Sequence, residues 1–275
     1  MRISKDIVMI QIVTFKPRLP LLLLASLCAL TGCKPDSAVK KGEVFDQHTP
    51  VPTAPAAVTS AGPNGSVSGV VHFTGKAPER VSIDMSMDPA CSLTAGQNLT
   101  EQYIVNNGKL ADVYIYVKSG APASSAPAGT PPVILDQKGC RYTPHVIAVQ
   151  QGGTVEFHNS DPTMHNVHAV PAIAGNQAVD VSQGPMGAPQ SRQFNAPEVM
   201  MPIRCNNHPW MEAFLNVSPT PWFAVTGPDG SFTLHGLPAG HYTLAAVHQK
   251  LGEQDIQVDV PADATAKADF TFSGK

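Results

Sequence analysis

Short apolar alternations separated by turn residues are the feature of this sequence that most constrains its fold. Residues 66–74 (SVSGVVHFT) and 154–158 (TVEFH) place apolar side chains at alternate positions, as half-buried strands do. No stretch sustains the 3.6-residue apolar period of a helix. The 26 prolines and 22 glycines favour tight turns between short strands. We therefore expect an all-β fold.

Length and charge narrow the choice of function. A chain of 275 residues can form one large domain or two modest ones. The formal net charge is −3 and the basic residues form no stripe. This pattern argues against nucleic acid as a partner.

The N-terminus has the pattern of an export signal. Basic residues precede the apolar run Leu19–Leu30, which is well short of the ~20 residues that span a bilayer. The stretch LTGC that ends at Cys33 resembles the lipobox of bacterial lipoproteins. The resemblance implies a signal peptide over residues 1–33, a lipid on Cys33 and a periplasmic location at the outer membrane, since Lys34 follows. A simple secretory signal is the alternative, and translation starts at Met1 or Met9.

Composition divides the rest of the chain. Residues 34–63 are rich in Pro, Ala and Thr and indicate a disordered tether. A hairpin is expected around Asn107-Gly108, with strands at Tyr103–Val105 and Ala111–Val117. Residues 121–132 (APASSAPAGTPP) indicate a linker, and a second β region covers residues 133–218.

The stretch CNNHPWM, Cys205 to Met211, carries the clearest chemistry. It spaces a thiol, an imidazole and a thioether at three-residue intervals. Soft sulfur donors with imidazole suit copper, and a His₂Cys set with a weak axial Met is the blue-copper arrangement. The second histidine must come from another strand, where His165 and His168 are available. Zinc is the competing metal, but it does not select Met.

Residues 133–218 resemble the cupredoxins, in particular amicyanin, pseudoazurin and plastocyanin. The resemblance is carried by CNNHPWM, by MHNVHAV and by YTPHVIAVQQGGTVEFHNSD. It implies a Greek-key β-sandwich with one type 1 copper per chain. The implied ligands are His165, preferred over His168, with Cys205, His208 and Met211.

The same resemblance implies roles for neighbouring residues. Asn166 and Asn206 would tie the two ligand loops together and affect the reduction potential, since relatives often have Thr or Ser where Asn206 stands. His208 would reach the surface as the electron exit, within an apolar patch of Pro162, Met164 and Pro209. Trp210 either shields the site from water or packs on a neighbouring domain.

The C-terminal region resembles the carboxypeptidase regulatory-like (transthyretin-like) β-sandwich, which is similar to a family of carbohydrate-binding domains. The turns GPDG and PAG between alternating strands carry this resemblance, and residues 64–120 resemble the opening strands of the same fold. We expect an outer sandwich from residues 64–120 and 219–275, with the cupredoxin domain inserted. A tandem of three parts is the alternative.

Three cysteines remain after Cys28 and Cys33 are assigned to the signal and the lipid. In an oxidising compartment two of them can pair. The alternatives to Cys91–Cys140 all involve Cys205. With Cys205 implied as a copper ligand, Cys91 and Cys140 form the disulfide, worth roughly 4 kcal/mol in the chain-entropy model.

The expected function is one-electron transfer by Cu(I)/Cu(II) cycling in a lipid-anchored periplasmic protein. The expected partner is a redox protein such as a c-type cytochrome or a periplasmic oxidoreductase, and no catalytic motif indicates an enzyme. Two alternatives stay open. One is a copper-binding or delivery lipoprotein that does not cycle, and the other is an adhesion or carbohydrate-binding module with a structural copper site.

Overall fold

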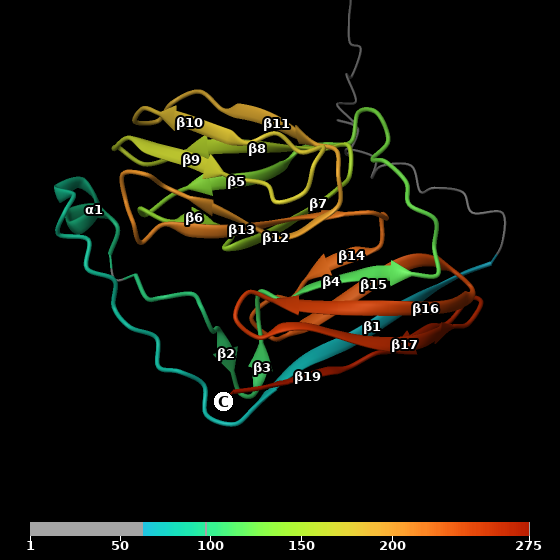
Figure 1. Ribbon diagram of the computed structural model, residues 1–275. Helices are drawn as coiled ribbons and strands as arrows, with labels where there is room; N and C mark the ends of the chain where they lie inside the picture. The colour runs from blue at the N-terminus through green and yellow to red at the C-terminus, as the bar shows by residue number, and fades with distance from the viewer. Residues whose placement is uncertain (1–62, 97, 275) are drawn as a thin grey trace, which may run out of the picture. The chain divides into compact units, whose positions relative to one another are not determined.

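The computed structural model of the protein describes residues 63–96 and 98–274 (Figure 1). The expected signal peptide, the lipidation site at Cys33 and almost all of the expected tether lie outside the described residues. The all-β prediction is confirmed, since the described elements are nineteen strands and one short helix. None of the helical structure in this part of the chain is long and apolar enough to cross a membrane.

Two sheets are built from residues 133–218, and we call them the inner sandwich. One has the strand order β10-β9-β12-β13-β7 and the other the order β11-β8-β5-β6. The bounds are β5 Val133–Gln137, β6 Tyr142–Thr143, β7 Val146–Gln150, β8 Gly153–Asn159, β9 His165–Ala169, β10 Val179–Gln183, β11 Gln190–Phe194, β12 Glu198–Arg204 and β13 Glu212–Ser218.

The inner sandwich encloses one core because its strands alternate. Strand β8 buries every second residue, and Val155 and Phe157 are fully buried. Apolar side chains from both sheets meet in the same cluster, among them Leu135, Val167 and Leu215. Cys205 and Met211 belong to this cluster as well, so the expected ligand loop packs on the core.

Two further sheets come from both ends of the described chain, and we call them the outer sandwich. One has the order β15-β1-β3-β2, with β18 and β19 also paired to β1, and the other has the order β14-β4-β16-β17. The bounds are β1 Asn64–Thr74, β2 Val105–Asn106, β3 Lys109–Leu110, β4 Tyr114–Ser119, β14 Phe223–Val225, β15 Ser231–Pro238, β16 Gly240–His248, β17 Gly252–Val260, β18 Thr265–Lys267 and β19 Phe270–Ser273.

Strand β1 joins the beginning of the described chain to its end. It pairs antiparallel with β15 and parallel with β18 and β19. Its burial alternates along its whole length, and Val67 and Val71 are fully buried in the core of the outer sandwich. The strands before and after the inner sandwich therefore share sheets.

The expected hairpin forms with shorter strands. Asn107 and Gly108 adopt φ of 50° and 72° between β2 and β3, as the Asn-Gly turn requires. The expected strand Ala111–Val117 is interrupted, because Asp112 has φ 59° and the chain then enters a different sheet as β4. The turn was predicted correctly, and of the expected second strand only the part from Tyr114 onward forms, as β4.

Residues 75–104, between β1 and β2, form what we call the capping segment. It contains the helix α1, Pro89–Thr94. Asp88 caps this helix by accepting a hydrogen bond from the Ala90 N–H, and proline stands in the first turn, where its missing N–H has no cost. The Cys91–Cys140 disulfide joins the helix to the turn between β5 and β6.

Candidate metal centre

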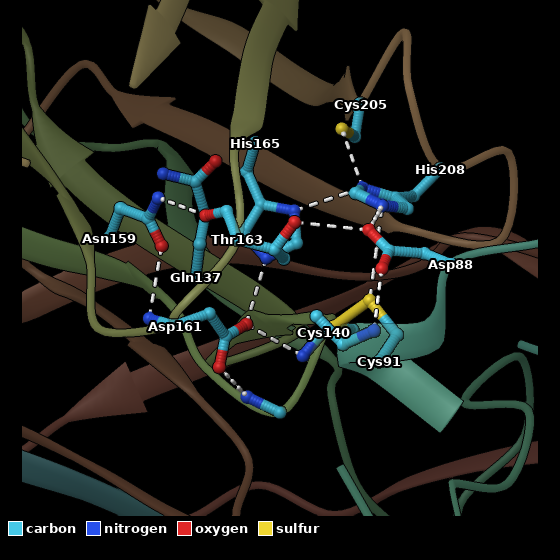
Figure 2. Close-up of polar contacts among 12 residues, drawn as sticks. Asp88, Cys91, Gln137, Cys140, Asn159, Asp161, Thr163, His165, Cys205 and His208 are labelled. Atoms are coloured by element: carbon cyan, nitrogen blue, oxygen red, sulfur yellow. Dashed lines mark hydrogen bonds and ion pairs between the residues drawn. A yellow bond between two sulfur atoms is a disulfide. The ribbon is translucent and has the colours of Figure 1, made fainter. Parts of the chain in front are cut away.

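Two segments bring three donor atoms together. His165 begins β9, while Cys205 and His208 lie in the loop between β12 and β13. The Nδ1 atoms of the two histidines are 2.9 Å apart, and the Cys205 Sγ is 3.5 Å from His208 Nδ1 (Figure 2). All three side chains are buried. One nitrogen from each imidazole and one sulfur therefore face a common centre.

These donors fit a metal ion. Nitrogens bound to a tetrahedral ion at about 2.0–2.1 Å and a sulfur at about 2.3 Å lie roughly 3.3–3.6 Å from one another. The observed S···N separation of 3.5 Å falls in this range, and the N···N separation of 2.9 Å is shorter, so the two imidazoles would move slightly apart around an ion. Met211 packs in the same core cluster and is only 1% exposed. A His₂Cys set beside a buried thioether suits copper better than zinc.

The loop itself is closed by its backbone. The Met211 N–H donates to the His208 carbonyl at 2.9 Å, and the Cys205 N–H donates to the Met211 carbonyl at 3.3 Å. These bonds hold the three-residue spacing of CNNHPWM in one turn. The two loop donors and Met211 are consequently positioned by the same short stretch.

The pKa values of two donors affect metal binding in opposite directions. Burial raises the pKa of the Cys205 thiol, but hydrogen bonds from His165 and from two backbone N–H groups outweigh it and bring the pKa to about 6. The thiolate is the form that binds metals. Burial lowers the pKa of His165, while Asp161 and Cys205 raise it to about 9. A metal cation competes with this proton for the imidazole nitrogen.

The outer nitrogen of each histidine faces a carboxylate. His165 Nε2 lies 2.8 Å from Asp161 Oδ2, and His208 Nε2 lies 2.9 Å from Asp88 Oδ2. Because an ionised carboxylate can only accept a hydrogen bond, each Nε2 carries a proton. The Nδ1 atom of each ring faces the common centre and is the nitrogen available to a metal. The hydrogen bond with His208 lowers the pKa of Asp88. Burial raises the pKa of Asp161, but the hydrogen bond with His165 and two backbone N–H groups lower it overall.

A buried amide network fixes the turn that leads into β9. Asn159 Nδ2 lies within hydrogen-bond distance of the carbonyls of Thr163 (2.9 Å), Gln183 (3.1 Å) and Gly184 (2.8 Å). Its Oδ1 accepts from the Asp161 N–H at 3.0 Å. Figure 2 shows Asn159, Asp161 and His165 in succession along this turn. The network therefore sets the position of both a donor and its carboxylate partner.

The expected tie between the two ligand loops has a counterpart in the structure. The Asn166 N–H donates to Cys205 Sγ at 3.3 Å, and Asn166 Oδ1 accepts from the Asn206 N–H at 3.3 Å. His168 does not face the centre, because its Nδ1 pairs with Asn206 Oδ1 at 3.0 Å. His165 and His168 differ by an odd number of positions along β9, so they point to opposite faces.

The structure differs from the expected electron exit at one residue. Pro162, Met164 and Pro209 are exposed, and Met164 is 51% exposed. His208, however, is only 3% exposed, because the capping segment covers its outer edge. Trp210 packs beside His208, with ring centroids 5.1 Å apart, and donates to the Cys140 carbonyl at 3.0 Å. Trp210 therefore lies between His208 and the turn that contains Cys140.

Sequence reasoning missed the capping segment and both carboxylates. The disulfide joins Cys91 to Cys140, the pair that the sequence analysis favours. Its Cys91 Sγ lies 3.8 Å from His208 Nε2. The signal that the sequence offered was the stretch Asp-Pro-Ala-Cys, because Asp followed by Pro is typical of a helix start, and a disulfide at Cys91 holds that start against the inner sandwich.

Only part of the chain is similar to the solved structures described below. No protein-family model and no curated protein matches it. A copper-containing nitrite reductase (NirK) from Thermus scotoductus SA-01 is 22% identical over 34% of this chain and 25% of its own, with a TM-score of 0.29. An oxidised mutant of amicyanin is 22% identical over 38% of this chain and 97% of its own, also with a TM-score of 0.29. The chain thus spans about a quarter of the length of the reductase.

Proposed function

We propose that this protein is a type 1 copper protein that transfers single electrons and is not itself an enzyme. The observation that supports the proposal is the convergence of His165 Nδ1, His208 Nδ1 and Cys205 Sγ in a buried centre, with Met211 buried in the same core cluster as Cys205. Bound there, copper would supply the Cu(I)/Cu(II) couple. We infer one ion per chain, held in a domain of the cupredoxin kind over residues 133–218.

The side chains described above suit an electron carrier because they are fixed. His165 is held by Asp161 and His208 by Asp88, while Cys205 accepts from the Asn166 N–H. Donors that keep their positions in both oxidation states need little rearrangement when the charge changes. Trp210 and the capping segment exclude water from His208.

The test is a visible absorption spectrum of residues 34–275 titrated with Cu(II). We expect an intense blue thiolate-to-copper band that reductant bleaches and oxidant restores. Cys205→Ala and His165→Ala should lack the band, whereas His168→Ala should keep it because that side chain faces Asn206. A colourless protein that binds Cu(I) tightly would overturn electron transfer in favour of copper delivery. A loss of the band in His168→Ala alone would overturn the ligand assignment.

We further propose that the protein is exported and held at the outer membrane by a lipid on Cys33. The motif LTGC supports this proposal. The experiment is detergent phase partition of the full chain made in a bacterium, with Cys33→Ser as the variant and Cys28→Ser as the matched control. We expect only Cys33→Ser to move to the aqueous phase. Equal partition of both variants would contradict the anchor.

The outer sandwich, which we assign to the carboxypeptidase regulatory-like kind, is proposed to hold the capping segment against the metal centre. The alternation of β1 and the turn at Gly230 support the assignment. The redox partner is inferred to be another protein, such as a c-type cytochrome or a periplasmic oxidoreductase. Cross-linking with and without bound copper would test whether such a partner approaches at the exposed Met164 and Pro209.

A further inference from the structure

Each donor histidine is hydrogen-bonded through its Nε2 to an aspartate, and one of these aspartates lies outside the inner sandwich. Asp161 lies in the turn before β9, but Asp88 belongs to the capping segment, 120 positions from His208 in the sequence. Figure 2 shows Asp88 approaching His208 on the side away from Cys205. The capping segment thus contacts the outer edge of a donor imidazole of the inner sandwich.

The charge of Asp88 is held in place. Its Oδ2 accepts from the Thr163 hydroxyl at 3.0 Å, and its Oδ1 accepts from the Ala90 N–H at 2.7 Å. The side chain is 21% exposed, and its partner His208 is 4% exposed. A carboxylate fixed in this way cannot rotate into water when the charge of the centre changes.

Two fixed negative charges next to a buried centre affect its two oxidation states unequally. Attraction to a carboxylate grows with the charge of the cation and is strong where water is excluded. A carboxylate that accepts from a ligand imidazole also raises the basicity of that ligand. Both effects stabilise Cu(II) more than Cu(I).

We propose that Asp88 is a positioning residue that lowers the reduction potential of the centre, in concert with Asp161, and so favours the role of electron donor. This inference rests on the proposed copper function. It assigns the capping segment, and with it the outer sandwich, a direct effect on the redox chemistry. Asp88 acts through His208 and does not itself reach the donor centre.

The experiment compares Asp88→Asn with Asp84→Asn in residues 34–275. Asn keeps the size of the side chain and an accepting oxygen but removes the charge. Asp84 lies on the same segment, is exposed and accepts from the Ser86 N–H, so its variant removes an equal charge that does not touch His208. Redox titration followed at the blue band gives the potential of each variant. Competition with chelators specific for Cu(I) and for Cu(II) gives the ratio of the two affinities.

We expect Asp88→Asn to shift the Cu(II)/Cu(I) affinity ratio about tenfold toward Cu(I), which corresponds to a rise of about 59 mV for a one-electron couple. Asp84→Asn should shift the affinity ratio less than twofold. Asp88→Glu keeps the negative charge and should shift the ratio less than Asp88→Asn does. Thr163→Val, which removes one hydrogen bond to Asp88, should give a shift between those of the two asparagine variants.

The outcomes separate this inference from the proposed function. A blue wild type in which Asp88→Asn and Asp84→Asn have the same potential would overturn the role of Asp88 and leave electron transfer intact. A wild type that holds copper without a blue band would overturn electron transfer, and the affinity ratio would still decide the role of Asp88. A protein that takes up no copper would overturn both.

Discussion

The inner sandwich buries many polar side chains, whereas the outer sandwich buries few, among them Thr226 and His248. The core of the outer sandwich consists of Val, Leu, Ile, Phe and Ala with a single Tyr, at residue 242. The inner sandwich, by contrast, contains eleven of the fifteen buried polar or charged side chains among the described residues. Most of them lie at the end that carries the donor atoms, including Gln137, Asn159, Asp161 and His165.

This difference separates stability from chemistry. Burying a polar group costs free energy unless it is hydrogen-bonded, so the polar end of the inner sandwich is stable only as a satisfied network. An apolar core has no such requirement and stabilises in proportion to the surface it buries. We therefore expect substitutions in the outer core to affect folding alone, and substitutions in the inner network to affect folding and metal retention together.

The largest effect is expected from Phe270→Ala in the outer core. Phe270 is 2% exposed and packs beside Phe232, with ring centroids 6.1 Å apart. Removing a buried aromatic ring should lower the free energy of unfolding by about 3–5 kcal/mol. Urea unfolding measures the loss, and Leu93→Ala, at an 84% exposed position, is the control. A changed copper spectrum in the folded variant would contradict the expectation that substitutions in the outer core affect folding alone.

The second prediction concerns the inner network. Asn159→Ala removes an amide that three buried carbonyls share and should cost about 2–3 kcal/mol. Because the Asp161 N–H also loses its acceptor, copper should dissociate faster from the folded variant. Asn106→Ala removes one exposed hydrogen bond and should change neither quantity. Unaltered copper dissociation in Asn159→Ala would show that the network does not position the site.

The third prediction is a pH dependence that originates in the outer sandwich. Burial, together with the charges of His145 and Lys250, lowers the pKa of His248 to about 4. The unfolded chain binds this proton below pH ~6.5, while the folded protein resists it until about pH 4. Stability is therefore full above pH ~6.5 and falls by roughly 3 kcal/mol as the pH drops through this window.

Urea unfolding between pH 7 and pH 4 measures that loss. His248→Gln should flatten the profile, whereas His235→Gln, at an exposed position, should leave it as in the wild type. Equal profiles for the wild type and His248→Gln would assign the acid sensitivity to other groups.

The smallest effect is expected at Asp112, where burial raises the pKa to about 6. The folded protein binds a proton there that the unfolded chain has lost above pH ~3.9, so stability falls as the pH rises from about 4 to 6. The difference between the ordinary pKa and a pKa of about 6 corresponds to at most ~3 kcal/mol at pH 7. Because Asp112 is partly exposed to solvent, Asp112→Asn should stabilise the protein at pH 7 by roughly 1 kcal/mol and have no effect below pH ~4. Asn also tolerates the φ of 59° at this position.

The control is Asp263→Asn, at an exposed aspartate that also has a positive φ, of 53°. Thermal unfolding at pH 7 should show a gain for Asp112→Asn alone. Matching gains in both variants would mean that backbone preference, and not a buried charge, is responsible.

Sequence reasoning was most successful where the signal is local. The alternation at residues 66–74 and 154–158 predicted strands that the structure has as β1 and β8, because a period of two residues directly reports a half-buried strand. The donors His165, Cys205 and His208 were named from residue chemistry and from a resemblance, and the structure brings them together.

What the sequence did not predict depends on contacts between distant segments. Helix α1 has six residues, too few for an apolar period, and its position is set by the Asp88 cap and by the disulfide to Cys140. The burial of His208 follows from that position and could not be read from the ligand loop. The expected strand Ala111–Val117 is interrupted at Asp112 for a similar reason, because the chain there passes from one sheet to another.

The capping segment also limits how the protein can be divided. A fragment cut to residues 133–218 would contain every proposed ligand, but it would lack Asp88 and leave Cys140 without Cys91. Cys140 and Cys205 would then be two thiols in one small fragment, free to oxidise with each other or with a second copy. For engineering, the smallest transplantable module is therefore residues 64–275, because one imidazole edge and one disulfide make the two sandwiches a single functional part.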